Sequence, residues 1–319
     1  MKWNEENETR EMRTFRNGRA LKGMKKVILT LGNFDGVHLG HRKIIKKVVR
    51  RARSLKLQSA VYTFDPHPLK VVAPQRSPLL LTDAATKARL IKALGIDNLI
   101  FARFTKELAE RHPEDFVRSV IVNGVSAKEV WVGHDFAFGR GRAGTAENLK
   151  ELGRKYGFEV FVIPAYKKGG HIVSSSRIRT LLHSGRVEEA ARLLSARYSI
   201  KGRVVRGRNI GKSIGFPTAN ISAASELVPK NGVYAGYVSL KDGLLPCVVN
   251  IGTAPTFGAR PRTIEVHILD FRGNLYGKKI EVAFVRRLRS ERAFASKEKL
   301  VAQIGKDVER ARRLLRARS

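Results

Sequence analysis

Two hydrophobic periods divide the chain. Between residues 27 and 194, short apolar runs alternate with segments in which apolar residues recur every three or four positions. The short runs are typical of buried parallel strands, and the longer period is typical of amphipathic helices. After Tyr198 the period becomes two, which indicates strands with one face in a core. The pattern predicts an α/β domain followed by an antiparallel β domain.

The first part of the chain alternates five predicted strands with helices. Strands are expected at 27–31, 59–64, 98–102, 129–132 and 158–163, and helices at 42–55, 82 or 83 to 94, 114–122, 145–157, 177–183 and 186–194. Residues that favour helix ends set several limits: Thr82 or Asp83, Pro113, Thr145 and Gly157. Such alternation favours a Rossmann-like parallel sheet covered by helices on both faces, with ligands bound beyond the carboxyl ends of the strands. The loops after the first, second and fourth strands are therefore the candidate site.

The last part of the chain predicts a compact antiparallel β-barrel followed by a helix. Strand-like segments at 233–240, 245–252, 263–271 and 278–285 are separated by turn sequences at 241–243 and 272–274. The final helix, from about Ser296, carries its apolar residues on one side: Leu300, Val301, Ile304, Val308, Ala311 and Leu315. We place the domain boundary between residues 185 and 186. Residues 1–23 lack a clear period and are interpreted as a lead-in with room for one short strand.

The most informative stretch is GNFDGVHLGH, residues 32–41, between the first strand and the first helix. Its three glycines let the backbone approach a ligand, and the first N–H groups of the following helix point at negative charge. His38 and His41, at i and i+3, are expected to point their rings the same way. Two imidazoles beside a phosphate-binding backbone suit charge stabilisation in phosphoryl chemistry. A glycine-rich turn with incidental histidines is the plainer interpretation, but the ten-residue pattern is far more specific.

This stretch resembles the HxGH signature of nucleotidylyltransferases, and GNFDGVH resembles the bacterial bifunctional riboflavin kinases/FAD synthetases. Further motifs of that family follow in order: FDPHP at 64–68, GHDFAFG at 133–139 and SSSRIR at 174–179, with Ser176 where the family usually has threonine. Each alone has a plainer interpretation, namely a proline-stiffened turn, a small aromatic core and hydroxyl N-caps. The resemblance implies catalysis by His38 and His41 in an FMN adenylyltransferase domain. It implies ATP binding by Gly32, Asn33, Phe34, Asp35, Gly36, Gly40, Ser174, Ser175, Ser176 and Arg179, and FMN binding by Asp65, His67, Asp135, Phe136 and Phe138.

The second domain contains GRNIGKSIGFPTANI at 207–221. Gly211-Lys212-Ser213 has the ending of a Walker A motif, but Arg206 stands where its first glycine is required, and Pro217 breaks the following helix. We therefore exclude a P-loop. GFPTAN instead resembles the riboflavin kinase signature. The resemblance implies ATP and Mg²⁺ binding by Gly211, Lys212, Gly215, Phe216, Pro217, Thr218 and Asn220, with Thr218 and Asn220 at the metal because hard oxygen ligands suit Mg²⁺.

A possible catalytic base of the kinase lies in TIEVHILDF, residues 263–271. If Ile264, Val266 and Ile268 point inward, Glu265 and His267 share the other face. An outward glutamate on a half-buried strand is ordinarily just solvated. The resemblance implies instead that Glu265 is the catalytic base, and NGVYAGYV and NIGTAPTFG are further pieces of the kinase. Ala254 departs from the family, in which many members carry a basic residue at this position.

Composition and length fit a two-domain protein without a membrane or export segment. The chain has 319 residues, 43% of them hydrophobic, which suffices for two cores. No apolar run approaches the roughly 20 residues of a membrane helix, and the polar N-terminus is unlike a signal peptide. The single cysteine, Cys247, excludes an intrachain disulfide framework and a cysteine-rich zinc site. We expect a cytoplasmic protein with no membrane partner.

The charge is the unusual property. The formal net charge is +34, from 62 Lys and Arg against 28 Asp and Glu. Such a field attracts polyanions, but the basic residues are spread along the chain and do not interleave with aromatic ones. A basic nucleic-acid-binding protein with an OB-like barrel is the alternative, and nucleic-acid binding is not expected as a function.

The motifs together predict a bifunctional enzyme of flavin cofactor synthesis. By resemblance, it phosphorylates riboflavin to FMN with Mg-ATP and then transfers AMP to FMN, giving FAD and pyrophosphate. The implied partners are ATP, riboflavin and FMN, the implied cofactor is Mg²⁺, and self-association stays open. A nucleotidyltransferase for another acceptor would leave GFPTAN and the barrel unexplained.

Overall fold

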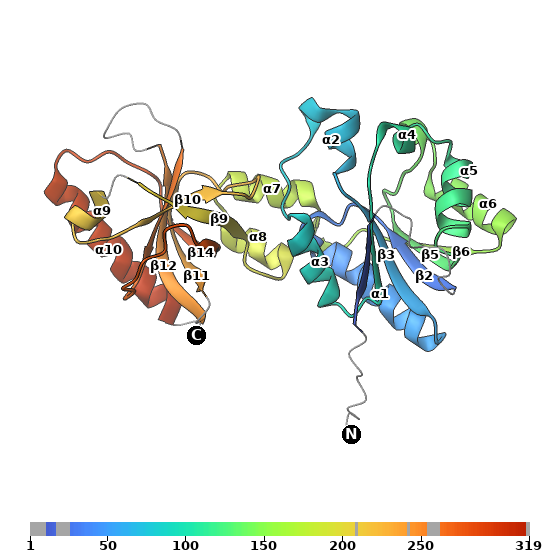
Figure 1. The fold of residues 1–319 in the computed structure, drawn as a ribbon, viewed down its shortest axis with the longest axis horizontal. Coiled ribbons are helices and arrows are strands. Elements are labelled where there is room, and N and C mark those ends of the chain that lie inside the picture. Colours follow the sequence, from blue (N-terminus) through green and yellow to red (C-terminus); the bar gives the residue numbers. More distant parts are fainter. Residues whose placement is uncertain (1–10, 17–25, 208–209, 241–242, 254–261, 317–319) are drawn as a thin grey trace, which may run out of the picture. The chain divides into compact units, whose positions relative to one another are not determined.

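The computed structural model describes residues 11–16, 26–207, 210–240, 243–253 and 262–316 (Figure 1). Backbone contacts divide the chain into two compact units, Met1–Pro78 with Thr82–Ser174, and Leu79–Leu81 with Ser175–Ser319. The domain boundary placed after residue 185 stays a prediction. Most of the lead-in expected at residues 1–23 lies outside the described residues, and within it Arg13–Arg16 forms strand β1.

The first unit is built on a six-stranded sheet in the order β1-β4-β3-β2-β5-β6. Every neighbouring pair in this sheet is parallel. The strands are β1 Arg13–Arg16, β2 Val27–Leu31, β3 Gln58–Phe64, β4 Asn98–Ala102, β5 Ala127–Gly133 and β6 Glu159–Ile163. The five strands expected from the apolar runs are confirmed, and β1 adds an edge strand beside β4.

Helices cover both faces of this sheet because the strands are apolar on both faces. On β2, Val27 and Leu29 pack with α5 (Pro113–Phe116), η3 (Val117–Val122) and α6 (Ala146–Tyr156). Ile28 faces the other way and packs with α1 (Leu39–Ser54) and α3 (Ala84–Lys92). The remaining short elements are η1 Asp35–Val37, α2 Pro68–Val72, η2 Pro74–Arg76, α4 Lys106–Ala109, η4 Arg140–Arg142, β7 Lys167–Lys168 and β8 His171–Ile172.

Local chemistry fixes the helix ends. Asp83 caps α3 by accepting a hydrogen bond from the Thr86 N–H, and Thr145 caps α6 in the same way through Asn148. Gly157 ends α6 at φ 78°, in the left-handed region that favours glycine. The helix expected at 114–122 is continuous in the chain, but its second part, η3, is wound as a π-helix.

The strand order places a topological switch point between β2 and β5. The chain runs from β2 to β3 and β4 on one side, then returns to β5 on the other side of β2. Loops that leave neighbouring strands in opposite directions open a crevice at their carboxyl ends, which is where such sheets bind ligands. The loops that begin at residues 32 and 134 border this point.

The second unit is a closed antiparallel barrel, in the order β10-β13-β12-β11-β14-β9, preceded by two helices. Its elements are α7 Ser175–His183, α8 Val187–Leu194, β9 Ser199–Val205, α9 Ile210–Ser213, β10 Ala219–Ala223, β11 Gly232–Leu240, β12 Gly243–Gly252, β13 Thr263–Ile268, β14 Lys279–Arg289 and α10 Lys297–Arg316. The predicted barrel and C-terminal helix are confirmed. Ala311 and Leu315 of α10 pack against the barrel wall.

Two strand ends differ from the sequence prediction. The strand expected at 263–271 stops at Ile268, because the chain turns at Leu269 and Asp270, where Asp270 has φ 58°. The strand expected at 278–285 continues to Arg289 because its last residues still pair with β11. The alternation expected in β13 is confirmed: the isoleucines and Val266 are buried, and Glu265 and His267 are half-exposed.

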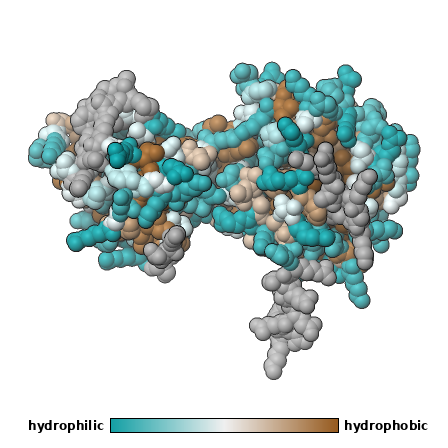
Figure 2. All heavy atoms as spheres, in the orientation of Figure 1, coloured by the Kyte–Doolittle hydropathy of each residue, from teal (hydrophilic) through white to brown (hydrophobic). Residues whose placement is uncertain are grey.

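Hydrophilic residues cover most of the visible face in Figure 2, with hydrophobic ones in smaller areas. No helix in the part of the chain that the structure describes is both long and apolar enough to cross a membrane.

Candidate functional site

The loop between β2 and α1 is strongly bent at the switch point. Phe34 and Val37 adopt φ 47° and 42°, and Gly36 adopts φ 79°. A side chain at Gly40 would require adjustment, since an added Cβ would lie 3.2 Å from the His38 ring. The chain therefore turns sharply and then enters α1, whose first N–H groups face the carboxyl edge of the sheet.

The bend brings the two predicted histidines together. The rings of His38 and His41 stack with centroids 3.6 Å apart and planes 18° apart. His38 is the N-cap of α1, and its Nδ1 accepts the His41 N–H at 3.4 Å. A neutral imidazole with an accepting Nδ1 carries its proton on Nε2. His38 can therefore donate a hydrogen bond only through Nε2.

His41 is held neutral in this environment. Burial, the neighbouring His38 and the Lys87 ammonium hold the pKa of His41 well below its usual range. Its Nδ1 is buried and has no hydrogen-bond partner among the described residues. The Phe34 ring meets the imidazole edge-on, with centroids 5.2 Å apart. A proton on Nδ1 would be a buried donor without a partner, so the tautomer with hydrogen on Nε2 is favoured.

The other predicted residues of this loop mostly shape it. Phe34 is 2% exposed and packs in the core with Val37. Asp35 is also 2% exposed, and its Oδ1 accepts from the Thr82 N–H at 3.1 Å and the Thr82 hydroxyl at 3.2 Å. The Gly36 N–H donates to the same hydroxyl at 3.1 Å. The groups of this part of the loop that are left to meet a ligand are backbone groups and the exposed Asn33.

Sequence reasoning missed Thr82 and Lys87 as parts of this site. Thr82 attracted notice only as a candidate helix cap. Lys87 lies one turn before Ile91 on the buried side of α3, and its ammonium donates to the Asn33 carbonyl oxygen at 2.7 Å. A lysine at a core position of an amphipathic helix was the signal that could have indicated it.

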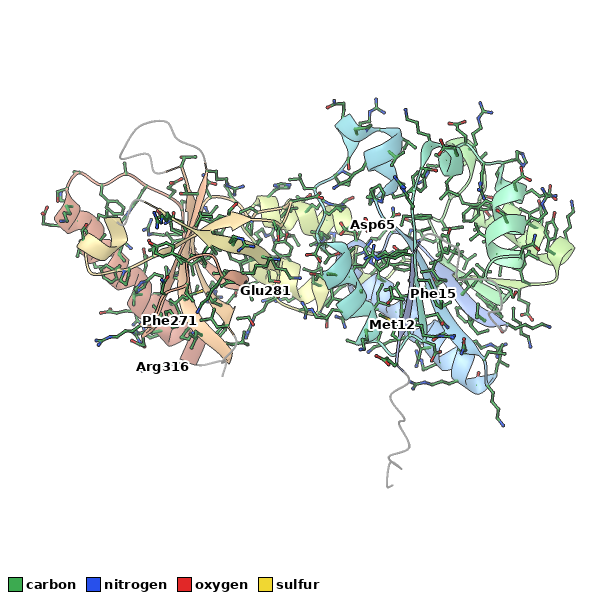
Figure 3. The ribbon with its side chains drawn as sticks, viewed as in Figure 1. Met12, Phe15, Asp65, Phe271, Glu281 and Arg316 are labelled. Carbon is green, nitrogen blue, oxygen red and sulfur yellow. The ribbon has the colours of Figure 1, made fainter. Side chains whose placement is uncertain are left out.

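The loops after β3 and β5 hold the residues predicted to bind FMN. Asp65, labelled in Figure 3 beyond the end of β3, forms an ion pair with Arg16 at 3.3 Å. His67 is the N-cap of α2, and its Nδ1 accepts from the Leu69 N–H at 3.2 Å. Asp135 projects into solvent, with its side chain 83% exposed. Its Oδ1 lies 3.8 Å from Nδ1 of the neighbouring His134.

Phe136 and Phe138 pack on each other and on the core. Their rings stack with centroids 5.5 Å apart, and Phe138 is tilted against Phe116 at 5.7 Å. Phe138 is 7% exposed, and Phe136 is partly buried. The aromatic-core interpretation therefore describes Phe138, whereas Phe136 keeps a surface that a planar ligand could meet.

The SSSRIR motif straddles the two units. Ser174 ends the first unit, and Ser175, Ser176 and Arg179 lie in α7 of the second. Arg179 Nε donates to the Leu79 carbonyl oxygen at 2.8 Å, within the second unit. The role predicted for this motif at the triphosphate stays a prediction.

In the second unit, the GFPTAN segment is shaped by a tight turn. The Phe216 N–H donates to the Gly211 carbonyl oxygen at 2.8 Å, and Gly215 has φ 86°. A Cβ at Gly211 would lie 2.3 Å from the Phe216 oxygen and 3.0 Å from Thr218 Oγ1. Glycine is therefore required at 211. Lys212 lies within the short helix α9.

Strand register aligns a row of polar residues across the barrel wall. Asn220 of β10 lies opposite Glu265 of β13, and Glu265 lies opposite Asn250 of β12. Directly opposed residues of antiparallel strands share a face, with Cβ atoms about 4.5–5.5 Å apart. Glu265 is thus flanked by two amides on one face of the barrel. Asn250 was not among the predicted site residues, although it stands in the quoted NIGTAPTFG.

His267 of β13 connects the GFPTAN segment to that strand through a hydrogen bond. Its Nδ1 donates to the Pro217 carbonyl oxygen at 2.8 Å, and the Phe216 ring meets its edge at 5.6 Å. A cavity of about 490 Å³ opens beside Thr218, with Val266, Phe271 and Tyr276 in its lining (Phe271 is labelled in Figure 3). A mostly apolar cavity beside hydroxyl and amide groups suits a flat heterocycle with a polar extension.

The protein oxygens at this site suit a metal ion only if a nucleotide also binds that ion. Within the described residues, no group of three or more histidine, cysteine, aspartate or glutamate side chains is arranged to hold a metal. Thr218 and Asn220 offer neutral oxygens, and Glu265 is the nearest strand partner with a carboxylate. Mg²⁺ is characteristically bound by few protein oxygens together with water and substrate phosphates, so these residues fit Mg²⁺ carried by a nucleotide.

Comparison with known proteins matches both parts of the chain. The FAD synthetase family model matches residues 21–177, and the riboflavin kinase family model matches residues 194–315. The bifunctional riboflavin kinase/FMN adenylyltransferase of Escherichia coli (strain K12) is 38% identical over 281 residues, covering 88% of this chain and 90% of the relative. The protein of the same name from Haemophilus influenzae is 36% identical over 285 residues, covering 89% and 92%.

A solved structure shares the fold over nearly the whole length. The crystal structure of a Streptococcus pneumoniae protein described as a macrolide-efflux protein aligns with a TM-score of 0.85 and 29% identity, covering 94% of this chain and 99% of that one. Its architecture is therefore similar to that described above.

Proposed function

We infer the function of this chain from the family to which it belongs, the bifunctional riboflavin kinases/FMN adenylyltransferases. The second unit phosphorylates riboflavin to FMN with ATP, and the first transfers AMP from ATP to FMN to give FAD. The observation that carries this proposal is the pair of consecutive family matches, each falling on the part that holds its own polar site. The nucleic-acid-binding alternative leaves both matches unexplained and is not favoured.

In the kinase half, we propose Glu265 as general base. Its carboxylate accepts the proton of the ribityl 5′-hydroxyl, the hydroxyl oxygen bonds to the γ-phosphorus of ATP, and the bond to the β-phosphate oxygen breaks to release ADP. General-base catalysis contributes typically about 10²–10⁴-fold. The two asparagines beside Glu265 in the strand register, Asn220 and Asn250, support this assignment because amides can orient a carboxylate and a substrate.

The nucleotide of the kinase half is proposed to lie along GFPTAN. The cavity beside Thr218 would take the base, and Gly211, Lys212, Gly215, Phe216 and Pro217 would shape the phosphate end. Thr218 and Asn220 would hold Mg²⁺, which neutralises charge on the phosphates when bound. Divalent metal use is typical of these families, and we propose that the metal used here is Mg²⁺.

This metal assignment predicts the effect of Thr218→Val, which removes the hydroxyl and keeps the shape. Losing one hydrogen bond or ligand contact to a charged group costs about 1.5–3 kcal/mol, or roughly 10- to 100-fold. We expect FMN formation at fixed ATP to require that much more Mg²⁺, measured by titrating Mg²⁺, and FAD formation from FMN to keep its requirement. Ser222→Ala, which removes an exposed hydroxyl from β10, the strand that follows Thr218, is the matched control. An unchanged Mg²⁺ requirement in Thr218→Val would remove Thr218 from the metal site.

In the adenylyltransferase half, we propose that His38 and His41 stabilise charge on the α-phosphate. An oxygen of the FMN phosphate bonds to the α-phosphorus of ATP, and the bond to the β-phosphate oxygen breaks to release pyrophosphate. The attacking phosphate is already anionic, so no general base is required. The stacked imidazoles at the N-terminus of α1 support this role, since each has one Nε2–H to donate.

The remaining predicted contacts of this half are proposals of the same kind. The backbone of Gly32, Gly36 and Gly40 would approach the triphosphate, with Ser174, Ser175, Ser176 and Arg179 as further contacts. Asp65, His67, Asp135 and Phe136 would contact FMN, and Phe138 would support Phe136 from below. The cytoplasmic location, self-association and lack of a nucleic-acid partner stay predictions.

Chromatography of the reaction products tests the function directly. The purified chain is incubated with riboflavin, ATP and Mg²⁺, and flavins are separated at successive times. We expect FMN first and FAD after it, with FMN alone sufficing as substrate for FAD. Formation of neither product would refute the proposal, and formation of only one would restrict it to that half.

A further inference from the structure

A lysine is buried beneath the histidine loop. Lys87 of α3 is 7% exposed and lies on the core side of the helix, one turn before the fully buried Ile91. Burying an ammonium group is unfavourable unless hydrogen bonds and counter-charges compensate for the lost hydration. A lysine at such a position therefore has defined partners, and they indicate what it does.

The partners of Lys87 belong to the two loops of the candidate site. Its ammonium donates to the Asn33 carbonyl oxygen at 2.7 Å and to Thr63 Oγ1 at 3.5 Å. The Thr63 hydroxyl itself donates to the same Asn33 oxygen at 3.1 Å. Asn33 is the second residue after β2, where the chain begins its sharp bend. One carbonyl oxygen is thus held by both the end of β3 and the side of α3.

The charge of Lys87 also acts on nearby titratable groups. Burial lowers the pKa of Lys87, and the carboxylates of Asp35 and Asp65 act against that shift. Among the described residues, the His38 and Phe34 rings contact the His41 ring, and the Lys87 ammonium acts on it electrostatically. A second proton on His41 is therefore disfavoured, because the described residues offer its buried Nδ1 no hydrogen-bond partner and burial and nearby charge oppose the imidazolium.

We propose that Lys87 is a positioning residue for adenylyl transfer, fixing the Asn33 carbonyl so that the loop at 32–41 presents a neutral His41. This inference rests on the proposed adenylyltransferase function of the first unit. Its chemical consequence is that His41 donates from Nε2 and does not act as an acid. A purely structural lysine would stabilise the unit without contributing to the lowered pKa of His41.

The test compares Lys87→Met with Lys92→Met in the full-length chain. Lys92 is exposed on the same helix and serves as the matched control. Misplacing a catalytic group by about 1 Å can lower a rate about 10²-fold. We expect Lys87→Met to lower the kcat of FAD formation from FMN by roughly that factor. Lys92→Met should keep the wild-type rate, and FMN formation in both variants should be unchanged.

The protonation of His41 is the second measurement, because a purely structural role of Lys87 would leave it unchanged. Removing the cation should raise the pKa of His41, while burial, the largest cause of the lowered pKa, remains. The titration is followed by NMR of histidine-labelled protein, with the His41 signal assigned through His41→Gln.

The outcomes separate this inference from the proposed function. A wild-type chain that forms no FAD refutes the function, whereas wild-type FAD formation in folded Lys87→Met refutes only the role of Lys87. An unshifted His41 titration in Lys87→Met also refutes it. If Lys87→Met fails to fold, Lys87→Arg replaces it, and the inference requires that this charge-retaining variant keep the low His41 pKa. A normal His41 titration in Lys87→Arg would overturn the inference.

Discussion

His41→Ala is expected to abolish most FAD formation while FMN formation continues. The N-terminus of α1 by itself contributes only about 0.3–1 kcal/mol toward an anion. Loss of one well-placed donor to a developing charge costs about 2.7–4 kcal/mol, or roughly 10²–10³ in kcat. The imidazole should therefore supply more of the stabilisation than the helix. The measurement is the steady-state rate of FAD formation from FMN and ATP.

The loss should fall on kcat more than on FMN binding. A donor that engages charge only in the transition state lowers kcat and kcat/KM together and leaves KM nearly unchanged. His171→Ala, on the exposed hairpin strand β8 of the same unit, is the matched control and should behave as wild type. FMN formation in the same preparation reports folding of the second unit.

A complementary substitution separates side chain from backbone. Gly40→Val would press a branched side chain against the His38 ring and the Val173 carbonyl. Both His41→Ala and Gly40→Val should lose FAD formation. If Gly40→Val lost it and His41→Ala did not, the loop would act through its backbone alone, and the imidazole mechanism would be wrong.

The sheet was predictable because its strands are buried on both faces. Runs such as 27–31 and 98–102 contain scarcely a polar residue, and the segments between successive runs are long enough to hold crossover helices. Parallel pairing and loop placement at one edge then follow from general rules of chain connection. What could not be predicted is the π-helical winding of η3, because it depends on tertiary packing rather than on a local pattern.

In the barrel, the segments were predictable but their pairing was not. Alternation shows that Glu265 faces away from the apolar residues of β13, but it does not show which strand lies beside β13. The closed order of the barrel brings Asn220 and Asn250 to either side of Glu265 from 45 and 15 residues away in the chain. The end of β13 also escaped prediction, because Asp270 leaves the strand in a conformation that few non-glycine residues adopt.

The sequence indicated residues that we propose to contact a ligand, but it missed residues that support them. The glycine spacing and the paired histidines predict a phosphate-binding loop within ten residues. Thr82 and Lys87 reach that loop from 41 residues or more beyond its end, and only the packing of α3 on the sheet brings them there. A lysine at a buried position of an amphipathic helix indicates such support, but the sequence does not show which residue it contacts.

The corresponding prediction for the second unit is that Glu265→Gln depresses riboflavin phosphorylation by roughly 10²-fold or more. The substitution keeps the size of the side chain and removes the group that accepts the hydroxyl proton. Because Asn220 and Asn250 lie opposite Glu265 in the register, the amide of the variant should have polar neighbours and the barrel should fold. FMN formation is measured from riboflavin, and FAD formation from FMN in the same protein should be unchanged.

A second glutamate of the barrel provides the control. Glu281 of β14, labelled in Figure 3, accepts a hydrogen bond from the Ser199 hydroxyl and stands outside the row that contains Glu265. Glu281→Gln should therefore keep the wild-type rate of phosphorylation. The base mechanism further requires that the loss in Glu265→Gln appear in kcat, with little change in the KM for ATP. If Glu265→Gln phosphorylated riboflavin as fast as wild type, Glu265 would be a solvated strand residue, and positioning by the nucleotide site would have to account for the entire rate.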